Sequence, residues 1–356
     1  MFDLVIFEHI FYFLLILTPI VFIHELGHYL AARKVGVKVE IFSVGFGKEL
    51  YSWIDNQGTK WRIALIPLGG YVKMQGDTNI ASVSDNKKTL NKGDLLSVSI
   101  LNRLFIFFAG PLANFLLGIL IFSLIYMYNG KQIISSEIGE ILPNSAAEKA
   151  NLLSGDIVKA VDTKKINNFN ELRYIVLENP GRKLLFEIER NKKTLYLDVI
   201  PKSLYLKDKN ITIGQLGVKS VKGEVKKVSF SEAIFTGFSD CYKIISESIK
   251  YLTVKFNINN FGSPIQIAEF SSDAAKQGII SFLFSVGYFS VAIGFLNLLP
   301  ILPLDGGHIF FGIIELIFKK PVPEVVQNFM LKSGVFLLIG FMIVIILKDI
   351  FIKVNF

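Results

Sequence analysis

The chain has 356 residues and a net charge of +8, and 51% of its residues are hydrophobic while only 19% are charged. Because a water-soluble domain carries about 25% charged residues, this composition indicates that much of the chain faces lipid. It excludes a purely cytosolic enzyme, a disordered regulator and a collagen-like fibre. The single cysteine, Cys241, excludes an intramolecular disulfide and a thiolate metal site. The basic residues form no stripe, so their charge predicts contact with anionic lipid and no nucleic-acid partner.

Four stretches reach the roughly 20 apolar residues that a membrane-spanning helix needs. They lie within residues 1–32, 104–128, 278–304 and 325–356. A cleaved signal peptide is disfavoured for the first stretch, because no Lys or Arg precedes it and no small-residue cleavage site follows. The sequence therefore predicts a polytopic α-helical membrane protein with four transmembrane helices.

Basic residues set the orientation of these helices, because Lys and Arg beside a span favour the cytoplasmic side. The N-terminal leader has none, whereas residues 33–103 hold eleven. These are Arg33, Lys34, Lys38, Lys48, Lys60, Arg62, Lys73, Lys87, Lys88, Lys92 and Arg103. We therefore expect residues 33–103 and 305–324 to be cytoplasmic, and residues 129–277 and both termini to lie outside.

The external segment changes character along its length. Residues 129–205 lack long apolar runs and consist of short predicted strands, turns and a small helix, which is typical of a soluble α+β module. Residues 206–277 are predicted as a linker that contains an amphipathic helix. Its apolar residues recur at spacings of three and four: Ile234, Phe238, Cys241, Ile245, Ile249 and Leu252. This helix lies along the outer membrane surface or packs on the soluble module, and the sequence leaves both possibilities open.

The first predicted span contains the sequence His24-Glu25-Leu26-Gly27-His28. On a helix, residues four apart share one face and lie about 6 Å apart along the axis, so two imidazoles at this spacing bind one tetrahedral zinc ion. Ionisable groups inside a membrane helix cost a few kcal/mol each, and a divalent cation compensates for that cost. The motif predicts zinc ligands at His24 and His28 and a catalytic base at Glu25 that takes a proton from bound water.

A catalytic zinc needs a third protein ligand, and Asp305 is the best candidate. It follows the third predicted span, and the predicted topology puts His28 and Asp305 toward the cytoplasmic ends of their helices, at one depth. Two alternatives stay open. His308 competes as the ligand, or Asp305 serves only as the N-cap of a helix over 306–318.

Two other polar features lie within apolar spans. Asn297 can hydrogen-bond an unwound substrate or a neighbouring helix, and Asn114 has the same two interpretations, with helix packing favoured because small residues precede it. Pro300 and Pro303 are expected to break the helix before Asp305 and free carbonyl groups there.

Residues 61–66 alternate in the manner of a strand that enters the sequence Pro67-Leu68-Gly69-Gly70-Tyr71. The two glycines permit a turn or a close backbone approach. This segment is predicted to form a hairpin, and a strand edge near the zinc would hold a substrate as an extended chain.

These residues together resemble the site-2 protease family of intramembrane zinc metalloproteases, in the bacterial branch of the regulator-of-sigma-E protease type. The similarity covers nearly the whole chain, and its motifs are His24–His28, Phe46–Lys48, Ile66–Met74, Ala109–Asn114 and Asn297–His308. The motif of two histidines and a glutamate occurs in many soluble proteases. Its position in a membrane helix, with a distant Leu304-Asp305-Gly306-Gly307, is far more specific.

The resemblance implies an endopeptidase that uses Zn²⁺ to cleave transmembrane segments of single-span proteins. It implies as substrates an anti-sigma factor already trimmed by an upstream site-1 protease, or remnant signal peptides. It also implies a location in the bacterial inner (cytoplasmic) membrane, in contact with the lipid bilayer.

The same resemblance assigns further parts of the chain. The hairpin would dip into the membrane beside the active site, and Asn297, Gly69, Gly70, Tyr71 and Pro300 would contact the substrate. Residues 129–205 resemble a PDZ-like domain, periplasmic or external, that filters or positions substrates. The chain departs from the best-known members in having one such domain where they have two, and in having Pro303 where their second proline precedes it by one residue.

Two functions of other classes were weighed against proteolysis. A membrane scaffold with a PDZ-like module and a structural metal is disfavoured, because a structural site has no need for Glu25. A transporter with an ion site at the membrane midplane is disfavoured by the soluble module and by the absence of repeated halves.

Overall fold

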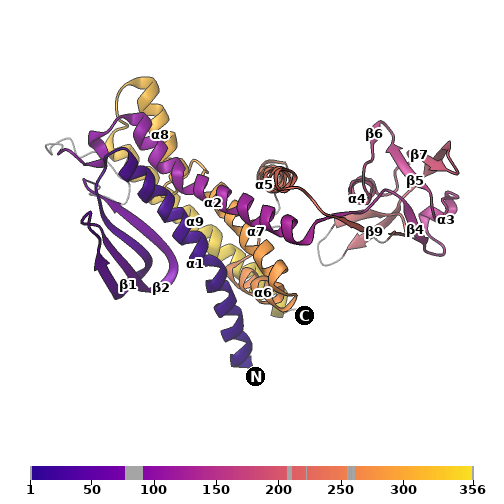
Figure 1. Cartoon of the computed structure of the whole chain (residues 1–356), viewed down its shortest axis with the longest axis horizontal. Helices are drawn as coiled ribbons and strands as arrows, with labels where there is room; N and C mark the ends of the chain where they lie inside the picture. The colour runs from indigo at the N-terminus through magenta and orange to yellow at the C-terminus, as the bar shows by residue number, and fades with distance from the viewer. Residues whose placement is uncertain are drawn as a thin grey trace. The chain divides into compact units, whose positions relative to one another are not determined.

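The computed structural model describes residues 2–76, 91–206, 211–221, 223–254, 256, 258 and 261–354 (Figure 1). Part of the predicted cytoplasmic segment, residues 77–90 with Lys87 and Lys88, lies outside the described residues. The chain divides into two compact units, which are described separately below. Unit 1 comprises Met1–Ile125 and Phe230–Phe356, and unit 2 comprises Tyr126–Ser229.

Four helices of unit 1 in the described part of the chain are long and apolar enough to cross a membrane. They are α1 (Phe2–Lys34), α2 (Ile100–Asn129), α7 (Ile279–Asn297) and α9 (Glu324–Val354). Each reaches about 28 Å or more at 1.5 Å per residue, close to the 30 Å hydrocarbon core of a bilayer. The four predicted spans are therefore found as helices, and the structure supports a multi-pass membrane protein.

The third span is shorter than the predicted range 278–304. Helix α7 ends at Asn297, and the chain turns through residues 298–304 before α8 (Asp305–Phe318) begins. The physical reason is the proline pair at Pro300 and Pro303, because proline lacks the N–H that a continuing helix needs. Gly306 allows α8 to fold back on this turn, since a Cβ there would clash with the backbone of Leu298.

Strands β1 (Val39–Ile54) and β2 (Lys60–Met74) pair with each other twice, because both are bent (Figure 1). Phe42 in the first half of β1 lies opposite Trp61 on one side and opposite Val72 on the other. The second half of β1 pairs with the start of β2. The order of segments across this sheet is 49–54, 60–64, 39–46 and 66–74. Among the described residues no strand pairs with the outer side of 66–74, which is a free sheet edge.

A shared apolar cluster fixes this sheet against α1 and α2. Its buried members include Tyr29 and Ala32 from α1, Phe42 from β1, Met74 from β2 and Ile106 from α2. Rings of the cluster pack closely, with Phe42 stacked on Trp61 at 4.2 Å between centroids. The sheet edge is therefore held at a fixed position beside the first helix.

Two more helices complete unit 1. Helix α5 (Phe230–Thr253) confirms the predicted amphipathic helix, but its buried face consists of Ala233, Thr236, Gly237 and Cys241. Most of the predicted apolar stripe is partly or fully exposed instead; Phe238, for example, is 58% exposed. Small residues pack on α2 because they allow close approach, as where Gly237 lies against Ser123.

Helix α6 (Pro264–Lys276) packs against α1 and was missed by the sequence analysis, which treated this stretch as linker. It begins with Ser263 as N-cap, whose side chain accepts from the N–H of Gln266, and with proline at the first turn. That combination is a helix-start signal.

Unit 2 contains short strands, a short helix α3 (Ala146–Lys149) and a longer helix α4 (Phe169–Leu177). Its largest described sheet has the order β6-β5-β7-β8. The strands are β3 (Lys131–Ile133), β4 (Ile138–Ile141), β5 (Ile157–Val161), β6 (Lys164–Lys165), β7 (Leu184–Arg190), β8 (Lys193–Val199), β9 (Lys202–Leu206), β10 (Ile211–Gln215), β11 (Val218–Ser220) and β12 (Glu224–Lys226).

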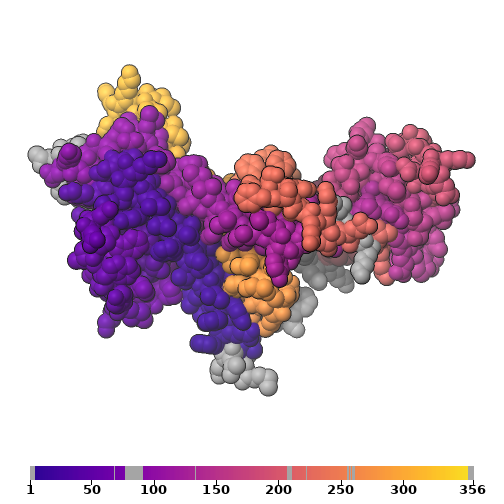
Figure 2. All heavy atoms as spheres, in the orientation of Figure 1, coloured from indigo at the N-terminus to yellow at the C-terminus, as the bar shows by residue number. Residues whose placement is uncertain are grey.

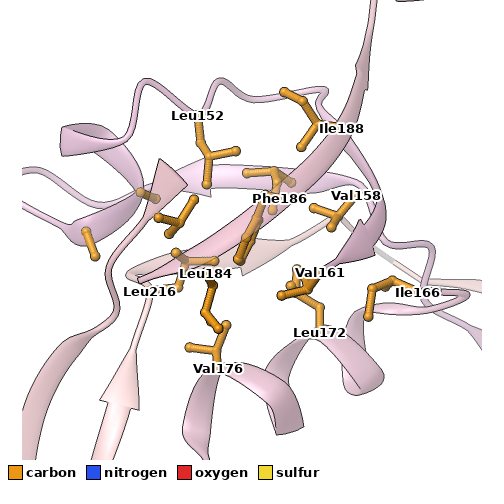
Figure 3. Close-up of a cluster of buried hydrophobic side chains, with 14 residues drawn as sticks. Leu152, Val158, Val161, Ile166, Leu172, Val176, Leu184, Phe186, Ile188 and Leu216 are labelled. Atoms are coloured by element: carbon orange, nitrogen blue, oxygen red, sulfur yellow. The ribbon is translucent and has the colours of Figure 1, made fainter. Parts of the chain in front are cut away.

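The predicted end of this module at residue 205 is wrong. Strands β10, β11 and β12 return to pair with β9, β4 and β3, so the unit extends to Ser229. Its core is apolar, with Leu152, Phe186 and Ile188 pointing toward one another between sheet and helices (Figure 3).

The surface of unit 1 is largely apolar, whereas unit 2 gathers its apolar residues in a core. Helix α1, drawn in indigo in Figure 2, is exposed over much of its length, and many of its large apolar side chains are exposed. Phe7 is 71% exposed and Leu30 is 56% exposed. This surface suits contact with lipid.

Candidate metal centre and active site

The two histidines of α1 face the same point. His24 and His28 are both buried, their ring centroids are 4.8 Å apart, and their Nε2 atoms are 3.2 Å apart. The spacing of four residues puts them one above the other on one helical face, as the sequence predicted.

Asp305 reaches this point from the first turn of α8. Its Oδ2 is 3.1 Å from His24 Nε2 and its Oδ1 is 3.4 Å from His28 Nε2. The residue at the N-cap position of α8 is Leu304, so the carboxylate of Asp305 faces the histidines and does not cap the helix. Burial raises the pKa of Asp305, but the neighbouring His28 and His24 lower it by more, so its net pKa lies below the ordinary value.

His308 lies near the cluster but makes a different contact. Its ring stacks on that of Phe107, with centroids 4.5 Å apart. Among the described residues, the group whose donor atoms all lie within 4.8 Å of one another is His24, His28 and Asp305, without His308. Burial lowers the pKa of His308 to about 4, so its ring is neutral at pH 7.

The outer nitrogens of the two imidazoles are also engaged. His28 Nδ1 lies 2.8 Å from the carbonyl oxygen of Ile106, to which it donates. His24 Nδ1 lies 3.2 Å from the side-chain amide of Asn114 on α2. Such contacts fix the orientation of rings whose Nε2 atoms bind a metal.

The separations between these donor atoms fit a zinc ion. A tetrahedral site with ligand distances of about 2.0–2.1 Å places its ligand atoms about 3.3 Å from one another. The two Nε2 atoms are 3.2 Å apart, and each lies 3.1 or 3.4 Å from a different carboxylate oxygen of Asp305, with one donor atom from each residue within 4.8 Å of the others. Two imidazoles and one carboxylate are a typical ligand set for catalytic zinc, with the fourth position left for water or substrate.

Gly110 keeps the space beside the cluster open. A Cβ on this residue would clash with His28 Nε2 and lie 2.9 Å from His24 Nε2. From the sequence alone, Gly110 was expected only to allow close packing of helices. Its spacing of four from Asn114 matches that of the two histidines, a signal that could have placed both α2 residues opposite the motif.

Glu25 lies next to the cluster and touches the sheet edge. It accepts a hydrogen bond from the backbone N–H of Val72 on β2. Gly70 permits this approach, since a Cβ there would lie 3.0 Å from Glu25 Cγ and 2.7 Å from the carbonyl oxygen of Ser43. The expected close backbone approach at Gly70 is thus confirmed, and Val72 is a contact that the sequence did not indicate.

A cavity of about 940 Å³ opens in front of the cluster, lined by α1, both strands, α2, α7 and α8. Of the predicted substrate-binding residues, Asn297, Gly69, Gly70 and Tyr71 line it. Pro300 does not: it is exposed in the turn after α7, and Pro303 lies in the cavity wall instead. The bend of the chain between α7 and α8 turns the two prolines to different sides.

The comparisons with known proteins agree with this geometry. The chain matches the model of peptidase family M50 over residues 12–341. A protein of Rhizobium meliloti (strain 1021), named provisionally as a zinc metalloprotease, is 34% identical over 339 residues, covering 90% of this chain and 91% of that protein. The metalloprotease MmpA of Caulobacter vibrioides is 32% identical over 367 residues, covering 93% and 92%.

A third relative, from Rickettsia conorii (strain ATCC VR-613 / Malish 7), also carries the provisional name of zinc metalloprotease. It is 34% identical over 349 residues, covering 95% of this chain and 97% of that protein. These matches favour an enzyme over the scaffold and transporter alternatives. The chain therefore belongs to peptidase family M50, the site-2 proteases, and is a membrane zinc metalloendopeptidase.

Proposed function

We propose that His24, His28 and Asp305 hold the zinc ion and that Glu25 is the catalytic base of a protease that cleaves within membrane helices. One observation carries the proposal: the donor atoms of two α1 histidines and of a carboxylate 277 residues later converge within 4.8 Å in the wall of a single cavity. Bound there, zinc supplies a water of pKa about 7 and polarises the scissile carbonyl group.

Glu25 moves the proton in this scheme. It takes a proton from the attacking water and delivers it to the leaving amide nitrogen. The N–H of Val72 holds the carboxylate beside the cluster, so the position of the base depends on the sheet edge as well as on α1.

The free edge of the sheet is the proposed binding site for the substrate backbone. A helical substrate must unwind before its amide can be attacked, and pairing with an exposed strand edge replaces its helical hydrogen bonds. Residues 69–74 line the cavity and belong to the segment whose outer side is free of strand partners among the described residues. Gly69, Gly70 and Tyr71 would contact the substrate there.

Asn297 is proposed to bind the unwound substrate near the reacting carbonyl. Its amide nitrogen lies 3.4 Å from His24 Nε2, within hydrogen-bond reach of a group held at the cluster. Pro300 is left out of this proposal because it lies outside the cavity, and its role is to end α7.

The proposed substrates are single-span membrane proteins, namely an anti-sigma factor first trimmed by a site-1 protease, or remnant signal peptides. The proposed location is the bacterial inner membrane, with unit 2 outside as a PDZ-like domain that selects or positions these substrates. The support is the family membership together with the basic residues of 33–103, which favour the cytoplasmic side.

The test uses the full-length chain in lipid vesicles with a single-span substrate. Glu25→Gln is expected to keep its zinc by elemental analysis and to cleave about 10²–10⁴-fold more slowly, the usual contribution of a general base. The matched control is Glu8→Gln, the same change at a position of α1 that instead contacts Ser272 and Lys276. Cleavage by Glu25→Gln at the control rate would remove Glu25 from the mechanism.

A further inference from the structure

Asn114 is a polar side chain for which the catalytic scheme has no task. It lies on α2, fully buried, and its side-chain Oδ1 has no hydrogen-bond partner among the described residues. Its amide nitrogen faces His24 Nδ1 at 3.2 Å.

The contacts of His28 indicate which tautomer His24 needs. His28 Nδ1 faces a carbonyl oxygen, which can only accept, so the ring carries its proton on Nδ1 and leaves the Nε2 lone pair free. His24 Nε2 points at the same cluster and needs the same tautomer to bind zinc. An amide N–H donated to His24 Nδ1 would force the proton onto Nε2, where it would oppose the metal.

Rotation of the Asn114 amide by half a turn resolves this conflict. The two ends of an amide have nearly the same shape, so the rotation exchanges Oδ1 and Nδ2 without other movement. The oxygen then accepts the proton of His24 Nδ1. We propose that Asn114 is a positioning residue that holds His24 as the Nδ1-protonated tautomer. This inference rests on the ligand roles given in the proposed function and goes beyond them.

The fold holds Asn114 in place for this role. Ser290 on α7 donates a hydrogen bond of 2.8 Å to the carbonyl oxygen of Asn114. Gly294 brings α7 close on the same side, since a Cβ there would lie 3.1 Å from Asn114 Cβ. The amide is thus clamped between α1 and α7 and has little freedom except rotation about its last bond.

Two substitutions separate this role from simple helix packing. Asn114→Asp keeps the shape and offers only acceptors, whereas Asn114→Leu keeps a similar volume and offers none. If Asn114 accepts from His24, the Asp variant retains zinc and the Leu variant loses affinity. If Asn114 only packs, the Leu variant behaves as the wild type.

The experiment measures zinc affinity of the purified full-length chain by competition with a chelator, together with the visible spectrum of the cobalt-substituted protein. Asn114→Leu is expected to bind zinc about 10–100-fold more weakly, the usual effect of losing such a contact, and to shift the cobalt bands. Asn114→Asp is expected to stay within about 3-fold of the wild type. Ser290→Ala removes only a hydrogen bond to the Asn114 backbone and leaves the side-chain amide, so a loss of at most about 3-fold is expected.

Any other result contradicts either the positioning role of Asn114 or the assignment of His24 as a zinc ligand. Wild-type affinity in Asn114→Leu, or a loss of tenfold or more in Asn114→Asp, overturns the positioning role. If the Leu variant does not fold, Asn114→Ala, which also removes both polar ends of the side chain, takes its place with the same two outcomes. His24→Ala separates the two claims: full zinc in that variant defeats the ligand assignment itself, whereas its loss beside unchanged Asn114 variants defeats only the positioning role.

Discussion

The two units of this protein place polar and apolar side chains in opposite ways. Unit 2 buries apolar residues such as Phe186 and Ile188, as a domain in water does. Unit 1 exposes many large apolar residues, with Phe336 81% exposed, and buries polar groups such as His24 and Asn114 beside its apolar clusters. The mean hydropathy of +0.48 is an average over these two arrangements.

The two units therefore obtain their structural specificity from different contacts. In water, burial of apolar area drives folding, so the interior of unit 2 depends mainly on apolar groups that fit together. In lipid the exposed surface is already in an apolar solvent, so the contacts that matter are close packing of small residues and satisfied polar groups. A small steric change in unit 1 should therefore disturb chemistry, whereas a cavity in unit 2 should disturb stability.

Gly110→Ala is expected to have the largest effect. The added methyl group must displace the imidazoles of His24 and His28 from the point where their Nε2 atoms meet. We expect zinc content to fall by about tenfold or more and cleavage to fall with it, although alanine raises helix propensity by about 1 kcal/mol. Elemental analysis of the purified variant measures the loss.

The matched control for that prediction is Gly340→Ala on α9. The same change there meets open space, so it brings the same gain in helix propensity without a clash. Full zinc occupancy in both variants would contradict the assignment of the metal to this point.

Phe186→Ala should have a smaller effect that is confined to unit 2. Phe186 is fully buried on β7, and removal of such a ring costs about 3–5 kcal/mol. Opening of unit 2 then becomes more than about 10²-fold more frequent, and limited proteolysis of the full-length protein within residues 126–229 should accelerate accordingly. Zinc content should not change.

Leu185→Ala is the control for this core substitution. Leu185 precedes Phe186 on the same strand but faces outward with 44% exposure, so its truncation should leave proteolysis nearly unchanged. Loss of zinc in Phe186→Ala would mean that the two units are not independent.

Much of the site followed from the sequence because its parts obey local rules. The helical repeat placed His24 beside His28, and the alternation of spans placed Asp305 at the same depth. The structure brings these three residues together as expected, while their roles as ligands stay a prediction. The four spans were found for the same reason, since length and hydropathy are read along the chain.

What the sequence missed depends on contacts between distant segments. Strands β11 and β12 are short and pair with β4 and β3 far back in the chain, so their part in unit 2 carried little local signal. Strand β10 pairs with its neighbour β9, which lies across the predicted end of the module. Gly110 matters only because α2 crosses α1 at the histidines. The second pairing of β1 with β2 required a bend that alternation alone does not encode.

The turn between β1 and β2 belongs to unit 1 but is polar. It therefore tests whether hydrogen bonds to a charged group stabilise part of a unit whose surface is otherwise largely apolar. Asp55 accepts hydrogen bonds from Trp61 Nε1 at 2.9 Å, from the N–H groups of Thr59 and Gln57, and from the hydroxyl of Tyr29. Burial raises the pKa of Asp55, but these hydrogen bonds lower it by more, so its net pKa lies below the ordinary value.

A carboxyl group with a lowered pKa stabilises the fold in its ionised form. That contribution is complete above the unfolded value of about 4 and is lost as the pH falls through the lower folded value. Trp53 and Trp61 are the only tryptophans of the chain and both lie in this sheet, so intrinsic fluorescence reports on it. We expect the emission to be constant from pH 7 to pH 5 and to change below about pH 4.

Asp55→Asn keeps the shape but cannot ionise, so its emission should lack the part of the acid transition that belongs to Asp55. Other groups that protonate in acid do so in both proteins, and the difference between the two curves isolates this carboxylate. The effect at pH 7 should be about 1 kcal/mol or less, since the turn is partly open to solvent. Identical curves would mean that Asp55 does not hold the turn. A difference would mean that a hydrogen-bonded carboxylate stabilises this turn as it would in a water-soluble domain. This would hold although the neighbouring Ile54 is apolar and 70% exposed.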